Sequence, residues 1–149
     1  MLTQTQNKPR VAVYIRVATY EQLGEPITAL YCRTASPCEQ GIAAQKDILT
    51  RHADKNGYRY CVMFVDDGES GVDINRPAFQ DMFRGIESGY IKRVVISDLS
   101  RLSRNYVLTN ELLILFNKYG VELVSVRDGF NSLDKDEGNP TVLFSERGF

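Results

Sequence analysis

Two arginines three residues apart, Arg101 and Arg104, follow directly after the apolar run Val94–Ile96. Such a run is typical of a buried strand, and ligands bind an open α/β sheet at the carboxyl ends of its strands. Because three residues make almost one helical turn, both guanidinium groups can face the same way. Two planar forks aimed at one point can each donate paired hydrogen bonds to a phosphate. The spacing therefore favours a phosphate site, and a solvated helix start with two surface arginines is the alternative.

Composition limits what such a site could serve. The chain of 149 residues has the length of one domain, and its hydrophobic content of 43% can fill a core. The net charge of −1 excludes a generally basic protein that coats nucleic acid, so any DNA contact must be local. The sequence has no apolar run that could span a membrane, and its largely polar start does not resemble a secretion signal. We therefore expect a cytoplasmic protein without membrane contact.

The cysteines do not form a metal-binding pattern. Cys32, Cys38 and Cys61 include no CxxC pair, and the chain has one histidine. Because a structural zinc site takes about four such ligands, we expect no metal. Cys32 and Cys61 lie in apolar runs and are interpreted as core thiols.

Strand and helix patterns alternate from residue 27 onward. Apolar runs predict strands, and apolar residues at helical spacing followed by a glycine predict helices. The expected strands are 27–32, 60–65, 93–97 and 121–126, and the expected helices are 41–56, 77–88 and 105–119. This alternation predicts an α/β fold of three layers, in which a largely parallel sheet is covered by helices on both faces.

A near-repeat precedes the first expected strand. Residues 11–22 resemble residues 29–40, because each segment reads apolar strand, Tyr-x-Arg, small-residue loop and Glu-Gln. Two such units are too few for a solenoid. One central strand can hold one copy, and a helix pattern follows the second copy directly. We therefore expect residues 29–32 in the central strand, and the first copy as an extra edge strand, a swapped arm or a disordered segment.

An ordered set of residues resembles the catalytic domain of the serine recombinases, the resolvase and invertase group. The set comprises Tyr31, Arg33, Ser36, Gln40, Gln45, Asp66, Ser70-Gly71, Arg76-Pro77 and the run Ser100–Arg104. It is most similar to the large serine recombinases of conjugative transposons and phages. The resemblance implies the resolvase catalytic fold, DNA as the substrate, and neither a metal nor a nucleotide cofactor.

In that family a serine hydroxyl attacks a DNA phosphate, forms a 5′-phosphoserine link and releases a 3′-hydroxyl. The resemblance makes Ser36 the nucleophile. Fixed cations lower the barrier because charge grows on the non-bridging oxygens during the attack. The implied cations are Arg33, Arg76, Arg101 and Arg104, and the implied supporting residues are Tyr31, Gln40, Gln45, Asp66, Ser70 and Ser100.

Some supporting roles have structural alternatives. Gln40 and Gln45 either orient the phosphate or the arginines, or are surface residues of a helix start. Asp66 either holds an arginine in place or caps the following turn. No histidine is placed to activate Ser36, and arginine, with a pKa above ~12, is not a base. Activation would therefore rest on the charge around the hydroxyl and on the substrate.

The chain departs from the family pattern in several ways. The usual serine position, two residues after Arg33, holds Ala35, whereas counting back four residues from Gln40 gives Ser36. Ser100 stands where a carboxylate commonly precedes the arginine pair. The long helix and DNA-binding region of the family are absent, so we expect an engineered fragment, a natural truncation or a remnant. The predicted parts are an extension at 1–26, a catalytic domain at 27–130 and a polar tail at 131–149.

These departures shape the expected function. We expect this chain alone to bind DNA weakly through phosphate contacts and not to recombine it, and the full-length protein to be a homo-oligomer. One alternative is a catalytically inactive accessory protein derived from a recombinase. Another is an unrelated flavodoxin-like or receiver-like domain, for which Asp66-Asp67 is the only acidic candidate.

Overall fold

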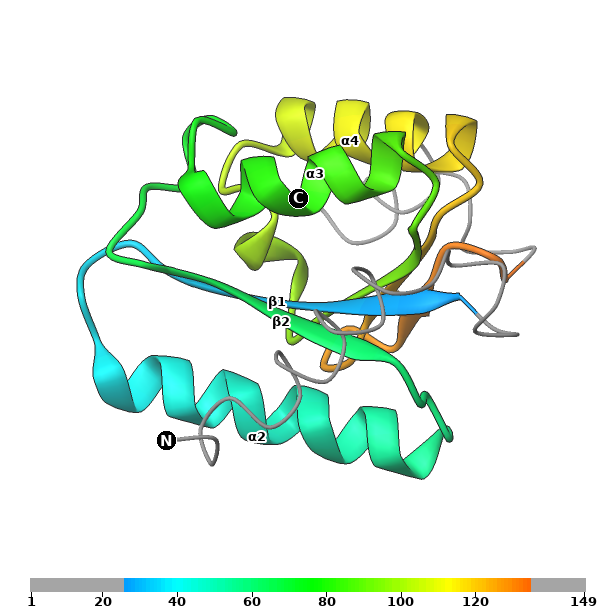
Figure 1. Cartoon of the computed structure of the whole chain (residues 1–149). Coiled ribbons are helices and arrows are strands. Elements are labelled where there is room, and N and C mark those ends of the chain that lie inside the picture. Colours follow the sequence, from blue (N-terminus) through cyan, green and yellow to red (C-terminus); the bar gives the residue numbers. More distant parts are fainter. Residues whose placement is uncertain (1–25, 135–149) are drawn as a thin grey trace.

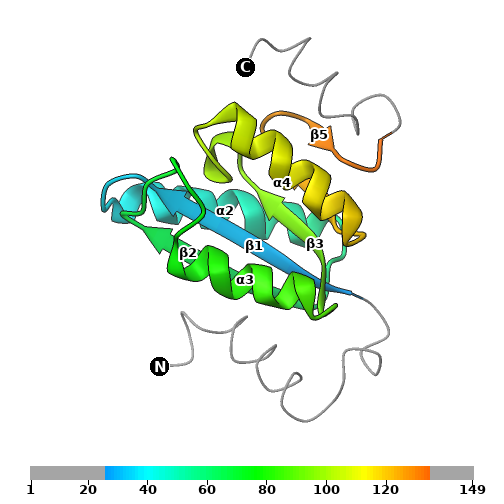
Figure 2. The same cartoon turned by 90° about the horizontal axis from the view of Figure 1, so that it is seen from above.

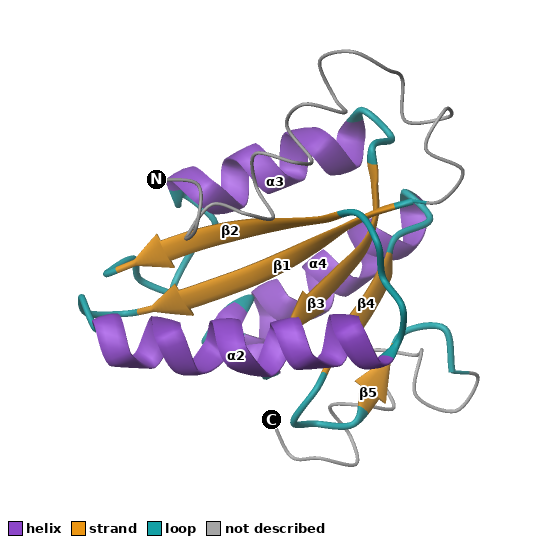
Figure 3. Cartoon of the chain, turned by 60° about the horizontal axis from the view of Figure 1, so that its bottom comes forward, coloured by secondary structure: helices purple, strands orange, loops and turns teal. Residues whose placement is uncertain are grey.

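Five strands in the order β2-β1-β3-β4-β5 form the sheet of the computed structural model, which describes residues 26–134 (Figure 3). They are β1 (Ile27–Thr34), β2 (Cys61–Asp67), β3 (Ile91–Ile96), β4 (Glu122–Ser125) and β5 (Phe130–Asn131). Strands β1 to β4 are mutually parallel, and β5 runs antiparallel to β4. The predicted, largely parallel sheet is therefore confirmed, and β5 is an addition to it.

Helices cover both faces of this sheet. Helix α2 (Glu39–Lys55) lies on one face, and α3 (Pro77–Glu87) and α4 (Tyr106–Lys118) lie on the other (Figures 1 and 2). Alternate residues of β1 point to opposite faces, so Tyr31 joins the core under α3 and α4 while Cys32 joins the core under α2. The three-layer prediction is confirmed. Within residues 26–134, no helix is both long and apolar enough to cross a membrane.

Strand β1 is an interior strand, and all eight of its residues are buried. It is hydrogen-bonded to β2 on one side and to β3 on the other, with Arg33 opposite Asp66 in the register. Residues 29–32 thus occupy an interior position, as expected from the helix that follows them. The first copy of the near-repeat, at 11–22, lies outside the described residues, as does most of the expected tail.

The starts of two helices depend on groups that a pattern of apolar residues does not reveal. Cys38 caps α2, because its Sγ accepts a hydrogen bond from the Gly41 amide at 3.3 Å. The cap of α3 comes from another element: the Asp66 carboxylate at the end of β2 accepts from the amides of Ala78 at 2.8 Å and Phe79 at 2.9 Å. A carboxylate suits this position because helix amino termini carry unpaired N–H groups and partial positive charge.

Helix α4 begins at the predicted cap. The side-chain oxygen of Asn105 accepts hydrogen bonds from the amides of Val107 at 2.9 Å and Leu108 at 3.3 Å. We expect Asn105→Ala to lower the free energy of unfolding by about 1 kcal/mol, because these amides lose their partner. Urea denaturation at an unchanged m-value would measure the loss. Asn105→Ser should retain most of the stability, and equal losses in both variants would contradict the capping role.

Candidate active site

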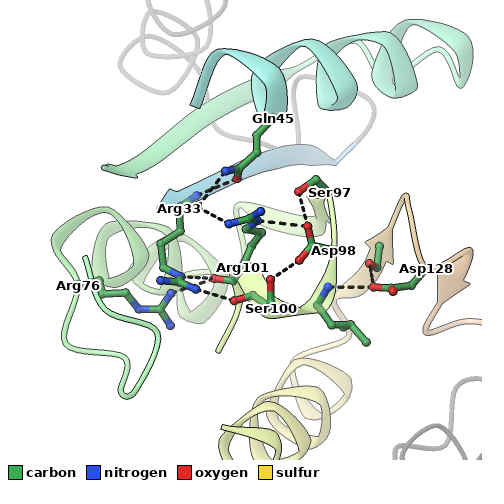
Figure 4. A network of polar contacts seen from close by, with 10 residues as sticks. Arg33, Gln45, Arg76, Ser97, Asp98, Ser100, Arg101 and Asp128 are labelled. Atoms are coloured by element: carbon green, nitrogen blue, oxygen red, sulfur yellow. Dashed lines mark hydrogen bonds and ion pairs between the residues drawn. The ribbon is translucent and has the colours of Figure 1, made fainter. Parts of the chain in front are cut away.

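Three of the predicted arginines meet at the carboxyl edge of the sheet (Figure 4). Arg33 lies at the end of β1, Arg76 directly precedes α3, and Arg101 belongs to the 3-10 turn η2 (Leu99–Arg101) after β3. The backbone carbonyl of Arg101 accepts from Nε of Arg33 at 3.1 Å and from Nη1 of Arg76 at 3.0 Å. One peptide group therefore joins guanidinium groups that come from distant parts of the chain.

The guanidinium of Arg33 is fully buried, with 0% of the residue exposed. Besides the Arg101 carbonyl, it donates to the carbonyls of Ser100 at 2.7 Å and Glu69 at 2.8 Å. Gln45 is also buried and exchanges two hydrogen bonds with the Arg33 backbone, at 3.0 and 2.9 Å. Burial and the nearby charge of Arg76 lower the pKa of Arg33, yet an arginine stays protonated in a protein. The site therefore keeps a buried positive charge.

Arg76 is also buried, and its partners extend to Asp66. Its Nη1 donates to the Tyr31 hydroxyl at 3.0 Å, and its Nη2 donates to the Leu102 carbonyl. The Tyr31 hydroxyl in turn donates to Asp66 at 2.7 Å. Burial and the hydrogen bond to Asp66 raise the pKa of Tyr31, so its hydroxyl stays protonated. Asp66 is thus linked to Arg76 through the Tyr31 hydroxyl, while its carboxylate caps α3 rather than the turn that directly follows it.

Arg104 is exposed, unlike Arg33 and Arg76. Its backbone amide donates to the Gly71 carbonyl at 2.9 Å, and Ser103 Oγ donates to the same carbonyl at 2.8 Å. An ideal Cβ added to Gly71 would lie 2.7 Å from Nη2 of Arg33 and 3.1 Å from Cγ of Arg104. Both arginines therefore pack against one glycine. A small cavity of about 120 Å³ opens beside Arg104 and Ser100.

Ser36 is exposed on the short loop that joins β1 to α2. The loop is closed by Asp67, whose Oδ1 accepts from the Thr34 hydroxyl at 2.5 Å and from the Cys38 amide at 2.8 Å. These two hydrogen bonds, that of Thr34 foremost, lower the pKa of Asp67. Ser36 therefore lies between Thr34 and Cys38, which both donate to Oδ1 of Asp67. The loop is at the edge of the sheet where β1 ends with Arg33 and Thr34.

Of the other predicted residues, Ser100 contacts this cluster, whereas Gln40 and Ser70 are exposed. Gln40 is exposed in the first turn of α2, and Ser70 is exposed and accepts from the Val72 amide at 3.1 Å. Ser100 is half-buried, and its hydroxyl donates to Asp98 while its carbonyl accepts from Arg33. Among residues 26–134, no hydrogen bond links Gln40 or Ser70 to the arginines.

Three residues at the site had no role in the expected recombinase chemistry. Asp67 closes the serine loop, Gly71 makes room for two arginines, and Asp98 binds Arg101 at 3.2 Å. The sequence could have pointed to Asp98, because this residue directly follows the strand predicted at 93–97 and precedes Arg101 by three residues. The sequence could also have pointed to Asp67, because it is the second of two acidic residues at the end of β2. Nothing in the sequence marks the close approach of Arg33 to Gly71.

Comparisons with known proteins agree with this fold. Residues 28–145 match the family model for the resolvase N-terminal domain. The fold is similar to the N-terminal catalytic domain of TP901-1 integrase, with a TM-score of 0.74, 26% identity, and coverage of 83% of this chain and 95% of that one. It is also similar to a resolvase family site-specific recombinase from Streptococcus pneumoniae, with a TM-score of 0.65, 31% identity, and coverage of 74% and 79%.

A curated phage protein is similar in sequence. It is the uncharacterized immunity region protein 3 of Bacillus phage phi105, which is 33% identical over 85 residues. The matched region covers 56% of this chain and 88% of the phage protein.

Proposed function

Because this chain belongs to the resolvase N-terminal domain family of site-specific serine recombinases, we propose that Ser36 and the arginine cluster carry out DNA strand cleavage. The family acts on DNA, and membership in it excludes the alternative of an unrelated flavodoxin-like or receiver-like domain. The observation that carries the proposal is the exposed serine loop at the same sheet edge as two buried guanidinium groups.

In the proposed step, Ser36 Oγ attacks a DNA phosphorus atom. The Oγ–P bond forms, the bond from phosphorus to the 3′-oxygen breaks, and the serine proton is balanced by the proton on the released 3′-hydroxyl. Arg101 and Arg104 reach solvent and bind the non-bridging oxygens, whose charge grows during the attack. Arg33 and Arg76 supply fixed positive charge from buried positions and bind the backbone carbonyls of residues 100–102.

The arrangement of the chain follows from the same proposal. Residues 27–130 form the catalytic unit, preceded by an extension at 1–26 and followed by a tail at 131–149. The unit uses no cofactor, because serine and fixed arginines suffice for the transfer. The whole chain, whose net charge is −1, binds DNA weakly through local phosphate contacts, and sequence choice and homo-oligomer assembly belong to the full-length protein.

Covalent trapping tests the proposal. The substrate is a DNA duplex in which sulfur replaces the 3′-bridging oxygen of one phosphodiester, because a thiolate leaves without a proton and rejoins poorly. Incubation at high protein concentration should attach the 5′-phosphate end of the DNA to Ser36. Peptide mass spectrometry would locate the link, and a thiol reagent would count the released 3′-thiol.

Two variants sharpen the assignment of the nucleophile. Ser36→Ala should give no adduct, whereas Ala35→Ser combined with Ser36→Ala moves the hydroxyl to the usual family position. An adduct on residue 35 of the double variant, with none on Ser36 of the wild type, would show that Ser36 is the wrong choice. DNA binding without any adduct in the wild type would support the catalytically inactive accessory protein instead.

A further inference from the structure

The carboxylate of Asp98 contacts several residues of the site at the carboxyl edge of the sheet. It follows β3 by two residues, and 21% of its side chain is exposed. It accepts hydrogen bonds from the hydroxyls of Ser97, at 3.0 Å, and Ser100, and from Nε of Arg101 at 3.2 Å (Figure 4). Three donors therefore converge on one half-buried carboxylate at the carboxyl edge of the sheet.

The same contacts fix the direction of Arg101. While Nε binds Asp98, Nη1 of Arg101 donates to the Arg33 carbonyl at 3.0 Å. Two bonds from one rigid, planar guanidinium determine both its position and the orientation of its plane. The contacts of the described residues thus engage Nε and Nη1, and the Nη2 edge is left to meet a phosphate.

We propose that Asp98 is the positioning residue for Arg101, and that it supplies from the end of β3 the carboxylate that Ser100 lacks. This inference rests on the proposed function, in which Arg101 binds the phosphate. Ser100 links Asp98 to Arg33, because its hydroxyl donates to Asp98 and its carbonyl accepts from Arg33. The two groups together replace the single carboxylate that the family pattern places directly before the arginine.

The charge state of Asp98 suits this role. Burial alone would raise the pKa of Asp98, but the hydrogen bond from Ser100 and the positive charge of Arg101 outweigh burial and lower it. Asp98 is therefore anionic at neutral pH and binds Arg101 as a charged partner. Such a bond is stronger than one between neutral groups.

The test measures Arg101 and phosphate directly in the full chain. In Asp98→Asn, the Nε–H signal of Arg101 in ¹⁵N NMR should shift and exchange faster with water. Inorganic phosphate should bind about tenfold more weakly, since a lost charge-assisted bond costs about 1.5 kcal/mol. Charge alone predicts the opposite sign, because removing an anion next to the site should strengthen phosphate binding. Asp81→Asn, which removes the same charge from an exposed position on α3, is the matched control and should change neither readout.

A second variant keeps the inference testable if Asp98→Asn does not fold. Asp98→Ser with Ser100→Asp moves the carboxylate to the family position and should recover most of the phosphate affinity and the Arg101 signal. Unchanged or tighter phosphate binding in folded Asp98→Asn, or a folded double variant that binds as poorly as the single one, would overturn the inference. Neither readout involves Ser36, so a failure of covalent trapping would leave this result interpretable.

Discussion

Replacing Asp66 with alanine should destabilise this protein more than any other single change at the site. The carboxylate is buried and accepts three hydrogen bonds, from the Tyr31 hydroxyl and from the amides of Ala78 and Phe79. Each buried donor left without a partner costs about 1–3 kcal/mol. We expect Asp66→Ala to lower the free energy of unfolding by about 4 kcal/mol, measured by urea denaturation. The loss should appear together with fraying of the first turn of α3 in hydrogen exchange.

The neighbouring Asp67 provides a matched control, because it is an exposed carboxylate on the same strand. Asp67→Ala should cost clearly less stability and leave α3 protected from exchange. Tyr31→Phe removes one of the three donors and should give a loss between the two, of about 1 kcal/mol. If Asp66→Ala were no more harmful than Asp67→Ala, the Asp66 carboxylate would not be what anchors α3 to the sheet.

Much of the fold was predictable because its elements keep a simple periodicity. The helix expected at 77–88 is α3 at Pro77–Glu87, where proline begins the helix and an apolar stripe faces the sheet. The prediction was less exact where a polar group determines the boundary. Helix α2 begins at Glu39 instead of residue 41 because the Cys38 thiol caps it. Strand β2 continues past residue 65 because Tyr31 and α3 bind the buried Asp66.

The meeting of the arginines was also accessible from the sequence. Parallel strands end at one edge of a sheet, so Arg33 at the end of β1 and Arg101 after β3 had to come close. What could not be predicted is the burial of Arg33 and Arg76. Their partners are mostly backbone carbonyls, at residues 69, 73 and 100–102, and every residue carries a carbonyl. No residue type therefore marks these contacts.

Because Arg33 and Arg76 are buried and Arg101 and Arg104 are not, the two pairs have different roles in the proposed reaction. Arg33 and Arg76 donate almost entirely to fixed groups of the protein, so their positions are set before any substrate arrives. Arg101 and Arg104 keep donors near solvent. Preorganised charge of this kind stabilises a developing oxyanion without reorganisation at the moment of reaction. Variants of the buried pair should therefore affect stability and activity together.

Gly71→Ala should misplace the buried charge of Arg33. The added Cβ would lie 2.7 Å from Nη2 and 2.8 Å from Cζ of Arg33, which is too close for either atom. The guanidinium is held by three carbonyls and cannot move away without breaking hydrogen bonds. Among the described glycines, Gly71 is not one with positive φ, so alanine at an open site would raise stability slightly. We instead expect a loss of about 2 kcal/mol in urea denaturation, because a rigid site resists overpacking.

A double-mutant cycle separates this contact from any other effect of the alanine. Arg33→Met removes the guanidinium atoms that the new Cβ would meet, so Gly71→Ala should cost little stability in that background. The two single losses would then exceed the loss in the double variant, and the difference would measure the contact between Gly71 and Arg33. Strictly additive losses would contradict the steric explanation. In that case the alanine would act on the loop itself, whose carbonyl at residue 71 receives the Ser103 hydroxyl and the Arg104 amide.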